Sequence, residues 1–84
     1  MNIDEFNEKW KVYLEEGFGG LEIDDDEITE YLDREFQELH KIPGFSFSQI
    51  KIKFGSARVY LTPLSIRTGE IEKKINSMLI KKLN

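Results

Sequence analysis

The sequence has no cysteine, one histidine, one tryptophan and only two prolines among its 84 residues. Without cysteine, disulfide bonds and thiolate metal sites are excluded. No apolar run approaches the roughly 20 residues that a membrane-spanning helix needs, and the first residues lack the pattern of a signal peptide. We therefore expect a cytoplasmic protein that does not insert into a membrane.

Charged residues are abundant and unevenly distributed. They make up 33% of the chain, and the net charge of −4 conceals a net −10 in residues 1–42 and a net +6 in residues 43–84. The hydrophobic content of 39% is sufficient for a folded chain. A chain of this length buries a thin core, so we expect a single domain over residues 1–84 without a deep catalytic cleft.

Two segments show the apolar period of an amphipathic helix near the ends of the chain. The first runs from about Ile3 to Glu16, with Asn2 as its N-cap and Glu5 completing a capping box. The second runs from Thr68 or Gly69 to about Leu83, with acids at its start and lysines at its end, as the helix dipole favours.

A third helical segment follows the clearest local signal in the chain. Asp24 is the predicted N-cap and Glu27 completes its capping box, while Pro43 and Gly44 stop the helix after Lys41. Acids in the first turn suit the positive end of the helix dipole.

Residues 50–62 change to the period of two that is typical of strands. Within this range, Gly55-Ser56 fits a two-residue type II′ turn that would join two antiparallel strands. This turn predicts the pairs Phe54–Ala57, Ile52–Val59 and Ile50–Leu61 on one face, and Lys53–Arg58 and Lys51–Tyr60 on the other.

The predicted fold is α+β, a small single domain of order α-α-β-β-α. Because a two-stranded hairpin alone is marginal in water, we expect the helices to pack on one face of the antiparallel β-hairpin. A short third strand at Leu21 to Ile23 is compatible with the pattern. Four apolar residues have no assigned place in the core: Phe45, Phe47, Leu64 and Ile66.

Residues 22–38 carry a net charge of −8. The run of acids from Asp24 to Glu27 does not have the alternating oxygens and central glycine of a calcium loop, so we expect no metal ion and no cofactor. The candidate surface for binding a protein is acidic: Asp25, Asp26, Glu27, Glu30 and Asp33. A helical wheel places Asp26, Glu30 and Asp33 opposite the apolar arc.

Two interpretations of this acidic surface stay open. It is either a solvated face that keeps the protein soluble, or a surface that binds a basic partner protein by imitating a phosphate backbone, as an inhibitor or regulator. Glu35 lies beside the apolar arc. It is either partly buried with a partner such as Arg58 or the Trp10 indole, or at the rim of the core.

The alternative site is the basic face of the hairpin: Lys51, Lys53, Arg58 and Tyr60. Like charges opposite each other on paired strands are destabilising, and a phosphate or carboxylate would relieve them. A nucleic-acid-binding module is therefore the second functional hypothesis. One aromatic residue on this face is few for stacking single strands, and a pI of about 5.0 is low for such a protein.

Enzymatic activity is not expected, because no nucleophile and base stand in a recognisable arrangement around the single histidine, His40. A structural subunit, monomeric or in a small homo-oligomer, is the third hypothesis. The sequence thus predicts a non-enzymatic binding protein with two oppositely charged candidate surfaces.

Overall fold

The computed structural model describes residues 1–63 and 65–83. Its elements follow the predicted order: α1 (Ile3–Trp10), the 3-10 turn η1 (Lys11–Tyr13), β1 (Gly20–Leu21), α2 (Asp26–Leu39), β2 (Ser46–Lys53), β3 (Ser56–Thr62) and α3 (Thr68–Leu83). The α+β fold class is confirmed. Leu64, for which the sequence suggests no core position, lies outside the described residues.

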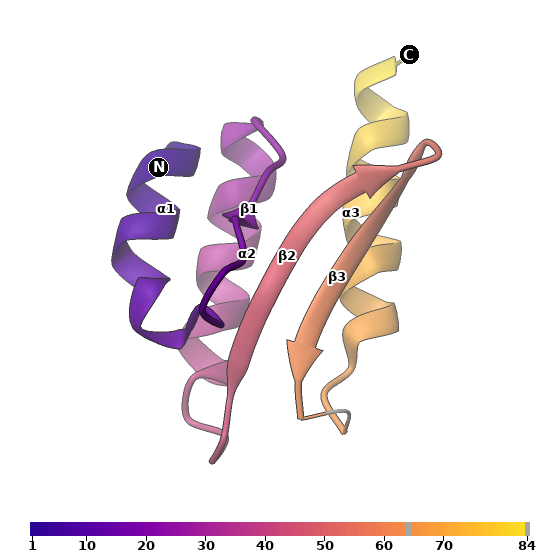
Figure 1. Cartoon of the computed structure of the whole chain (residues 1–84). Coiled ribbons are helices and arrows are strands. Elements are labelled where there is room, and N and C mark those ends of the chain that lie inside the picture. Colours follow the sequence, from indigo (N-terminus) through magenta and orange to yellow (C-terminus); the bar gives the residue numbers. More distant parts are fainter. Residues whose placement is uncertain (64, 84) are drawn as a thin grey trace.

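The sheet has three strands in the order β1-β2-β3. β2 and β3 are antiparallel, and β1 runs parallel to β2 with Leu21 opposite Ile50. The short third strand is thereby confirmed. The helices lie on one side of the sheet, with α2 between α1 and α3, and the hairpin turn lies at the same end of the molecule as the C-terminus (Figure 1).

The core lies between the sheet and the helices and is rich in aromatic rings. Phe36 of α2 is at its centre, with ring centroids 5.1 Å from Phe6 of α1, 5.0 Å from Phe47 of β2 and 5.2 Å from Phe45. Such edge-on and tilted contacts stabilise beyond the area that the rings bury. Phe45, Phe47 and Ile66 are therefore core residues, which their sequence pattern did not indicate.

The first helix is shorter than predicted. Asn2 and Glu5 form the expected capping box, with Asn2 Oδ1 accepting from Glu5 N at 2.8 Å. The α-helix ends at Trp10, however, instead of continuing to Glu16. The chain turns because Leu14 forms a parallel bridge with Phe47 and the Glu15 amide donates to the Phe47 carbonyl at 2.8 Å, so the sheet edge competes with the helix.

The N-cap of α2 is Asp25, one residue later than predicted. Its Oδ1 accepts a hydrogen bond from the Ile28 amide at 2.9 Å, and its backbone is extended. Asp24 is an exposed residue of the preceding loop. Consecutive aspartates offer the same chemistry to the helix start, so the local signal locates the helix without deciding which aspartate caps it.

The register of the hairpin differs from the predicted one. The turn residues are Phe54 and Gly55, both with positive φ (54° and 78°), which is a type I′ geometry instead of a Gly55-Ser56 turn. The observed pairs are Ile50–Val59, Lys51–Arg58, Ile52–Ala57 and Lys53–Ser56. Residues 50–53 of β2 thus face partners two positions earlier in β3 than expected, which keeps Ile50 and Val59 on the buried face because the side-chain period is two. Ile52, which was expected on the same covered face, is 42% exposed near the turn.

A β-bulge interrupts β2. Phe47 pairs with Leu61 and Ile50 with Val59, so Ser48 and Gln49 together stand opposite Tyr60 alone. The extra residue lets Phe47 and Ile50 both face the core, although they are three positions apart and would lie on opposite faces of a regular strand. Strict alternation from Ile50 would have placed Phe47 on the solvent face.

Both edges of the sheet are closed by side chains of the helices. On β1, Asn7 of α1 accepts from the Leu21 amide at 2.9 Å and donates to the Leu21 carbonyl at 3.0 Å. On β3, Glu72 and Asn76 of α3 accept from the amides of Val59 and Ala57 at 2.8 and 2.7 Å. These contacts occupy backbone groups that would otherwise be free to pair with another strand.

Candidate functional site

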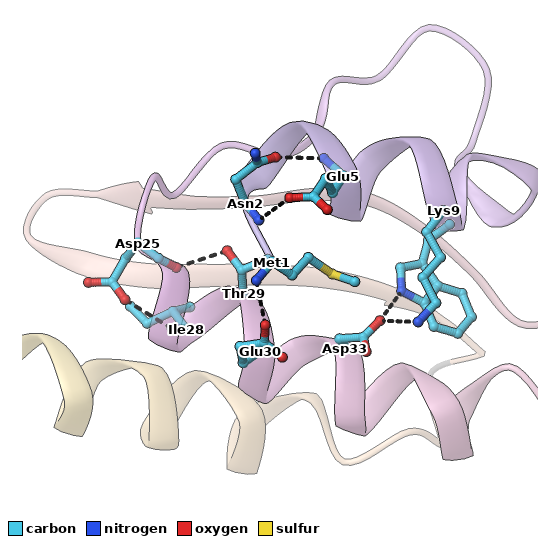
Figure 2. Close-up of polar contacts among 10 residues, drawn as sticks. Met1, Asn2, Glu5, Lys9, Asp25, Ile28, Thr29, Glu30 and Asp33 are labelled. Atoms are coloured by element: carbon cyan, nitrogen blue, oxygen red, sulfur yellow. Dashed lines mark hydrogen bonds and ion pairs between the residues drawn. The ribbon is translucent and has the colours of Figure 1, made fainter.

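Helix α2 carries the acidic candidate surface, but its neighbours on both flanks supply cations. Four of the five carboxylates are therefore ion-paired, although Asp26, Glu27 and Glu30 remain exposed. Figure 2 shows α2 between α1 and α3, with Glu30 directed to the N-terminal ammonium group of Met1 and Asp33 directed to Lys9.

Asp33 is the most enclosed of these acids, with its side chain 15% exposed. One of its oxygens lies 2.8 Å from Lys9 Nζ and accepts a hydrogen bond from Trp10 Nε1 at 2.9 Å. Burial opposes the charged form of this carboxyl, but the hydrogen bonds from Lys9 and Trp10 outweigh it and lower its pKa. The helical wheel, which placed Asp33 opposite the apolar arc, took no account of α1, whose Lys9 and Trp10 enclose the carboxylate.

Asp25 and Glu27 face α3. Lys82 Nζ lies 3.3 Å from a carboxylate oxygen of Asp25 and 3.1 Å from one of Glu27. Hydrogen bonds from Lys82 to Glu27 and then Asp25 raise the pKa of the lysine. Of the five acidic candidates, Asp26 alone has no ion pair within residues 1–63 and 65–83, and it is exposed.

Glu35 is partly buried, with its side chain 20% exposed, and its partner is Arg67 at 2.8 Å. Neither Arg58 nor the Trp10 indole fills this role, because Arg58 is on the far face of the sheet and Trp10 is bonded to Asp33. Nearby, burial and then the charge of Glu35 raise the pKa of the Tyr31 phenol. Glu35 is thus a structural ion-pair residue between α2 and the start of α3.

The basic candidate residues lie on the outer face of the hairpin, away from the helices. Lys51 and Arg58 are directly opposite each other on β2 and β3. Lys53 is two residues closer to the turn on the same face, and Tyr60 is 46% exposed. Within the described part of the chain, none of the three cations has a carboxylate within ion-pair distance. The acidic helix α2 cannot neutralise them, because the sheet stands between.

Phe54 belongs to this surface, although its alternation with Ile50 and Ile52 predicted an inward side chain. In the observed turn its side chain is 90% exposed. Lys53 Nζ lies 5.6 Å from the centre of its ring. The one signal in the sequence that could have indicated this position is Gly55, which suits the second position of a type I′ turn as well as the first of a type II′ turn.

We name the outer residues Lys51, Lys53, Phe54, Arg58 and Tyr60 the hairpin surface. It combines three cations with two accessible aromatic rings on one two-stranded element. Phosphates and the faces of unpaired bases are the ligands that suit such a set.

The rest of the described surface offers no comparable grouping of charged and aromatic side chains. A hollow of about 650 Å³ runs along β3 and the start of α3, but its charged lining residues Arg67 and Glu70 lie within 3.8 Å of each other. His40 packs against Trp10 and caps α2, with Nδ1 2.9 Å from the Phe36 carbonyl oxygen. Among the described residues, no group of three or more potential metal ligands is present. No described helix is both long and apolar enough to cross a bilayer.

Comparisons of this chain with known protein families, with curated proteins and with solved structures find no match. The functional argument consequently rests on the hairpin surface and on the acidic helix themselves.

Proposed function

We propose that this protein is a non-enzymatic nucleic-acid-binding module that uses the hairpin surface. The observation that carries the proposal is the Lys51–Arg58 pair, two cations directly opposite each other with no carboxylate within ion-pair distance in the described part of the chain. Opposed like charges destabilise an antiparallel pair. A bound phosphate turns this repulsion into two attractions, and it releases counterions from the nucleic acid.

The distribution of ion pairs supports the basic surface over the acidic one. Lys82, Lys9 and the N-terminus pair with four of the five acidic candidates, so three positive charges offset much of the field that a basic partner would feel. The low overall pI does not describe the hairpin. Its outer face holds only cations among its charged residues, and the acids lie on the helices and in the loops of residues 14–25, outside the hairpin.

The test is fluorescence anisotropy with labelled single-stranded and duplex oligonucleotides at low salt, where phosphate contacts are strongest. We expect the wild type to bind and the double variant Lys51→Gln/Arg58→Gln to bind at least tenfold more weakly. The matched control is Lys11→Gln/Lys41→Gln, which removes the same charge from two exposed cations elsewhere.

Two results would contradict the proposal. One is the absence of wild-type binding to every oligonucleotide at low salt. The other is an equal loss in both double variants, which would show a response to net charge instead of a site.

A second proposal concerns the acidic helix. Asp26 and the neighbouring loop residue Asp24 are exposed and have no ion pair within residues 1–63 and 65–83, so they could contact a basic protein. Asp24→Asn/Asp26→Asn should weaken binding of a lysine-rich peptide, whereas Glu16→Gln/Glu38→Gln should not. Equal binding by both variants would contradict this second proposal.

A further inference from the structure

Phe54 has a backbone conformation that disfavours its own side chain. Its φ of 54° lies in the left-handed region, which bulky residues adopt rarely and which asparagine and glycine adopt readily. The side chain is 90% exposed, so it gains almost nothing from packing in compensation. A residue that is both unfavourable for the turn and unused by the core indicates a role outside the fold.

The surroundings of the Phe54 ring suit an aromatic ligand that carries phosphate. Lys53 Nζ is 5.6 Å from the ring centre. The Lys51–Arg58 pair lies further along the hairpin, with Lys51 three positions before Phe54. A base stacked on the ring would therefore place its flanking phosphates near these cations. Tyr60, 46% exposed on the same outer face, offers a second ring further along β3.

We infer that Phe54 is a stacking platform for an unpaired base, so the ligand of the hairpin surface is single-stranded nucleic acid. This inference rests on the proposed function and specifies its substrate class. In a duplex, both faces of each internal base are covered by neighbouring base pairs. A ring at a hairpin turn can stack only on a base that is not already stacked on both sides.

The experiment compares Phe54→Asn with the wild type and with Phe54→Tyr. Asparagine is favoured before glycine in a type I′ turn, so Phe54→Asn should melt at the same temperature as the wild type or higher. Loss of function in this variant could not then be attributed to misfolding. Phe18→Asn, which removes a half-exposed phenylalanine from the loop after η1, is the matched control.

The probes are labelled single-stranded DNA, single-stranded RNA and a blunt duplex of the same length, measured by anisotropy at one salt concentration. Removal of one stacked base by substitution of the aromatic residue typically weakens binding about fivefold to a hundredfold. We expect this loss for Phe54→Asn on one or both single strands, with little change on the duplex. Phe54→Tyr and Phe18→Asn should bind as the wild type does. Comparison of DNA with RNA identifies which sugar the site prefers.

The outcomes separate this inference from the proposed function. If Phe54→Asn binds single strands as tightly as the wild type, the stacking role is wrong while the phosphate-binding role stands. An equal loss on single strands and duplex also overturns it, because the ring would then not distinguish unpaired bases. If the wild type binds no oligonucleotide, both the inference and the proposed function fail.

Discussion

Replacement of Asn7 by alanine tests how the fold closes its sheet. The Asn7 amide makes two hydrogen bonds with the backbone of Leu21, at 2.9 and 3.0 Å, and Leu21 is 1% exposed. Water cannot easily replace the amide at this position. Leaving a buried backbone donor and acceptor without partners costs roughly 1–3 kcal/mol each, so we expect Asn7→Ala to lower the free energy of unfolding by about 2–4 kcal/mol.

A loss of this size is large for a domain of 84 residues. About 1 kcal/mol shifts the melting temperature of such a domain by roughly 4–8 °C, so the variant should melt at least 8 °C below the wild type. The loss cannot come from helix propensity, because alanine is a better helix former than asparagine. The measurement is urea unfolding followed by the fluorescence of Trp10, the single tryptophan, which is 5% exposed.

Asn2→Ala is the matched control for this experiment. It removes an asparagine hydrogen bond from the same helix, but at the exposed N-cap, where the expected cost is about 1 kcal/mol. If Asn7→Ala costs no more than Asn2→Ala, then Asn7 does not close the edge of β1 in the way that the structure indicates.

Two further predictions concern the other sheet edge and the acid dependence of stability. The wild type should be monomeric by light scattering, whereas Glu72→Ala/Asn76→Ala should lose about 2 kcal/mol of stability and self-associate, because the amides of β3 become available to a second copy. A variant that is destabilised but still monomeric would contradict the role of these side chains in protecting the edge. Asp33 has a lowered pKa in the folded state, so its contribution to stability is present above its unfolded pKa of about 3.9 and is lost as the pH falls through the folded value. The stability advantage of the wild type over Asp33→Asn, from urea unfolding at several pH values, should therefore shrink below about pH 4, and an advantage independent of pH would contradict this.

Local signals in the sequence predicted the elements and their order well. The capping box of Asn2 and Glu5 depends only on residues three apart, and the start of α2 depends on aspartates next to an apolar period. Such interactions between residues close in sequence can be predicted without knowledge of the rest of the fold. The end of α1 could not, because the sheet edge at Phe47 takes the backbone of Leu14 and Glu15 out of the helix.

The hairpin shows a different limit of sequence interpretation. Gly55 fits two turn types, and the type II′ turn predicted from Gly55-Ser56 is wrong because Phe54 and Gly55 form the turn with positive φ. The bulge at Ser48 and Gln49 has no signature in the period, and it arises where Phe47 and Ile50 both enter the core. Both errors concern register, which depends on packing against the helices more than on the strands themselves.

The sequence predicted which residues make up the candidate sites, but it did not predict which side chains of other elements surround them. A helical wheel gives the direction of Asp33 from the axis of α2, but it cannot show that Lys9 and Trp10 of another helix stand there. The pairing of Lys82 with Asp25 and Glu27 joins residues more than 50 positions apart. Conversely, the hairpin cations were correctly placed on one outer face, because that face follows from alternation alone.

The salt dependence of single-strand binding tests the central claim most directly. Each phosphate contact with a single strand contributes about −0.7 to the slope of log K against log salt concentration, so three hairpin cations predict a slope of about −2. Lys51→Gln/Arg58→Gln removes two of them, and its slope should fall to about −0.7. A wild type that binds with this slope, together with a shallower slope in the variant, would support the hairpin as the binding surface. Identical slopes in the two proteins, or no binding by the wild type, would contradict it.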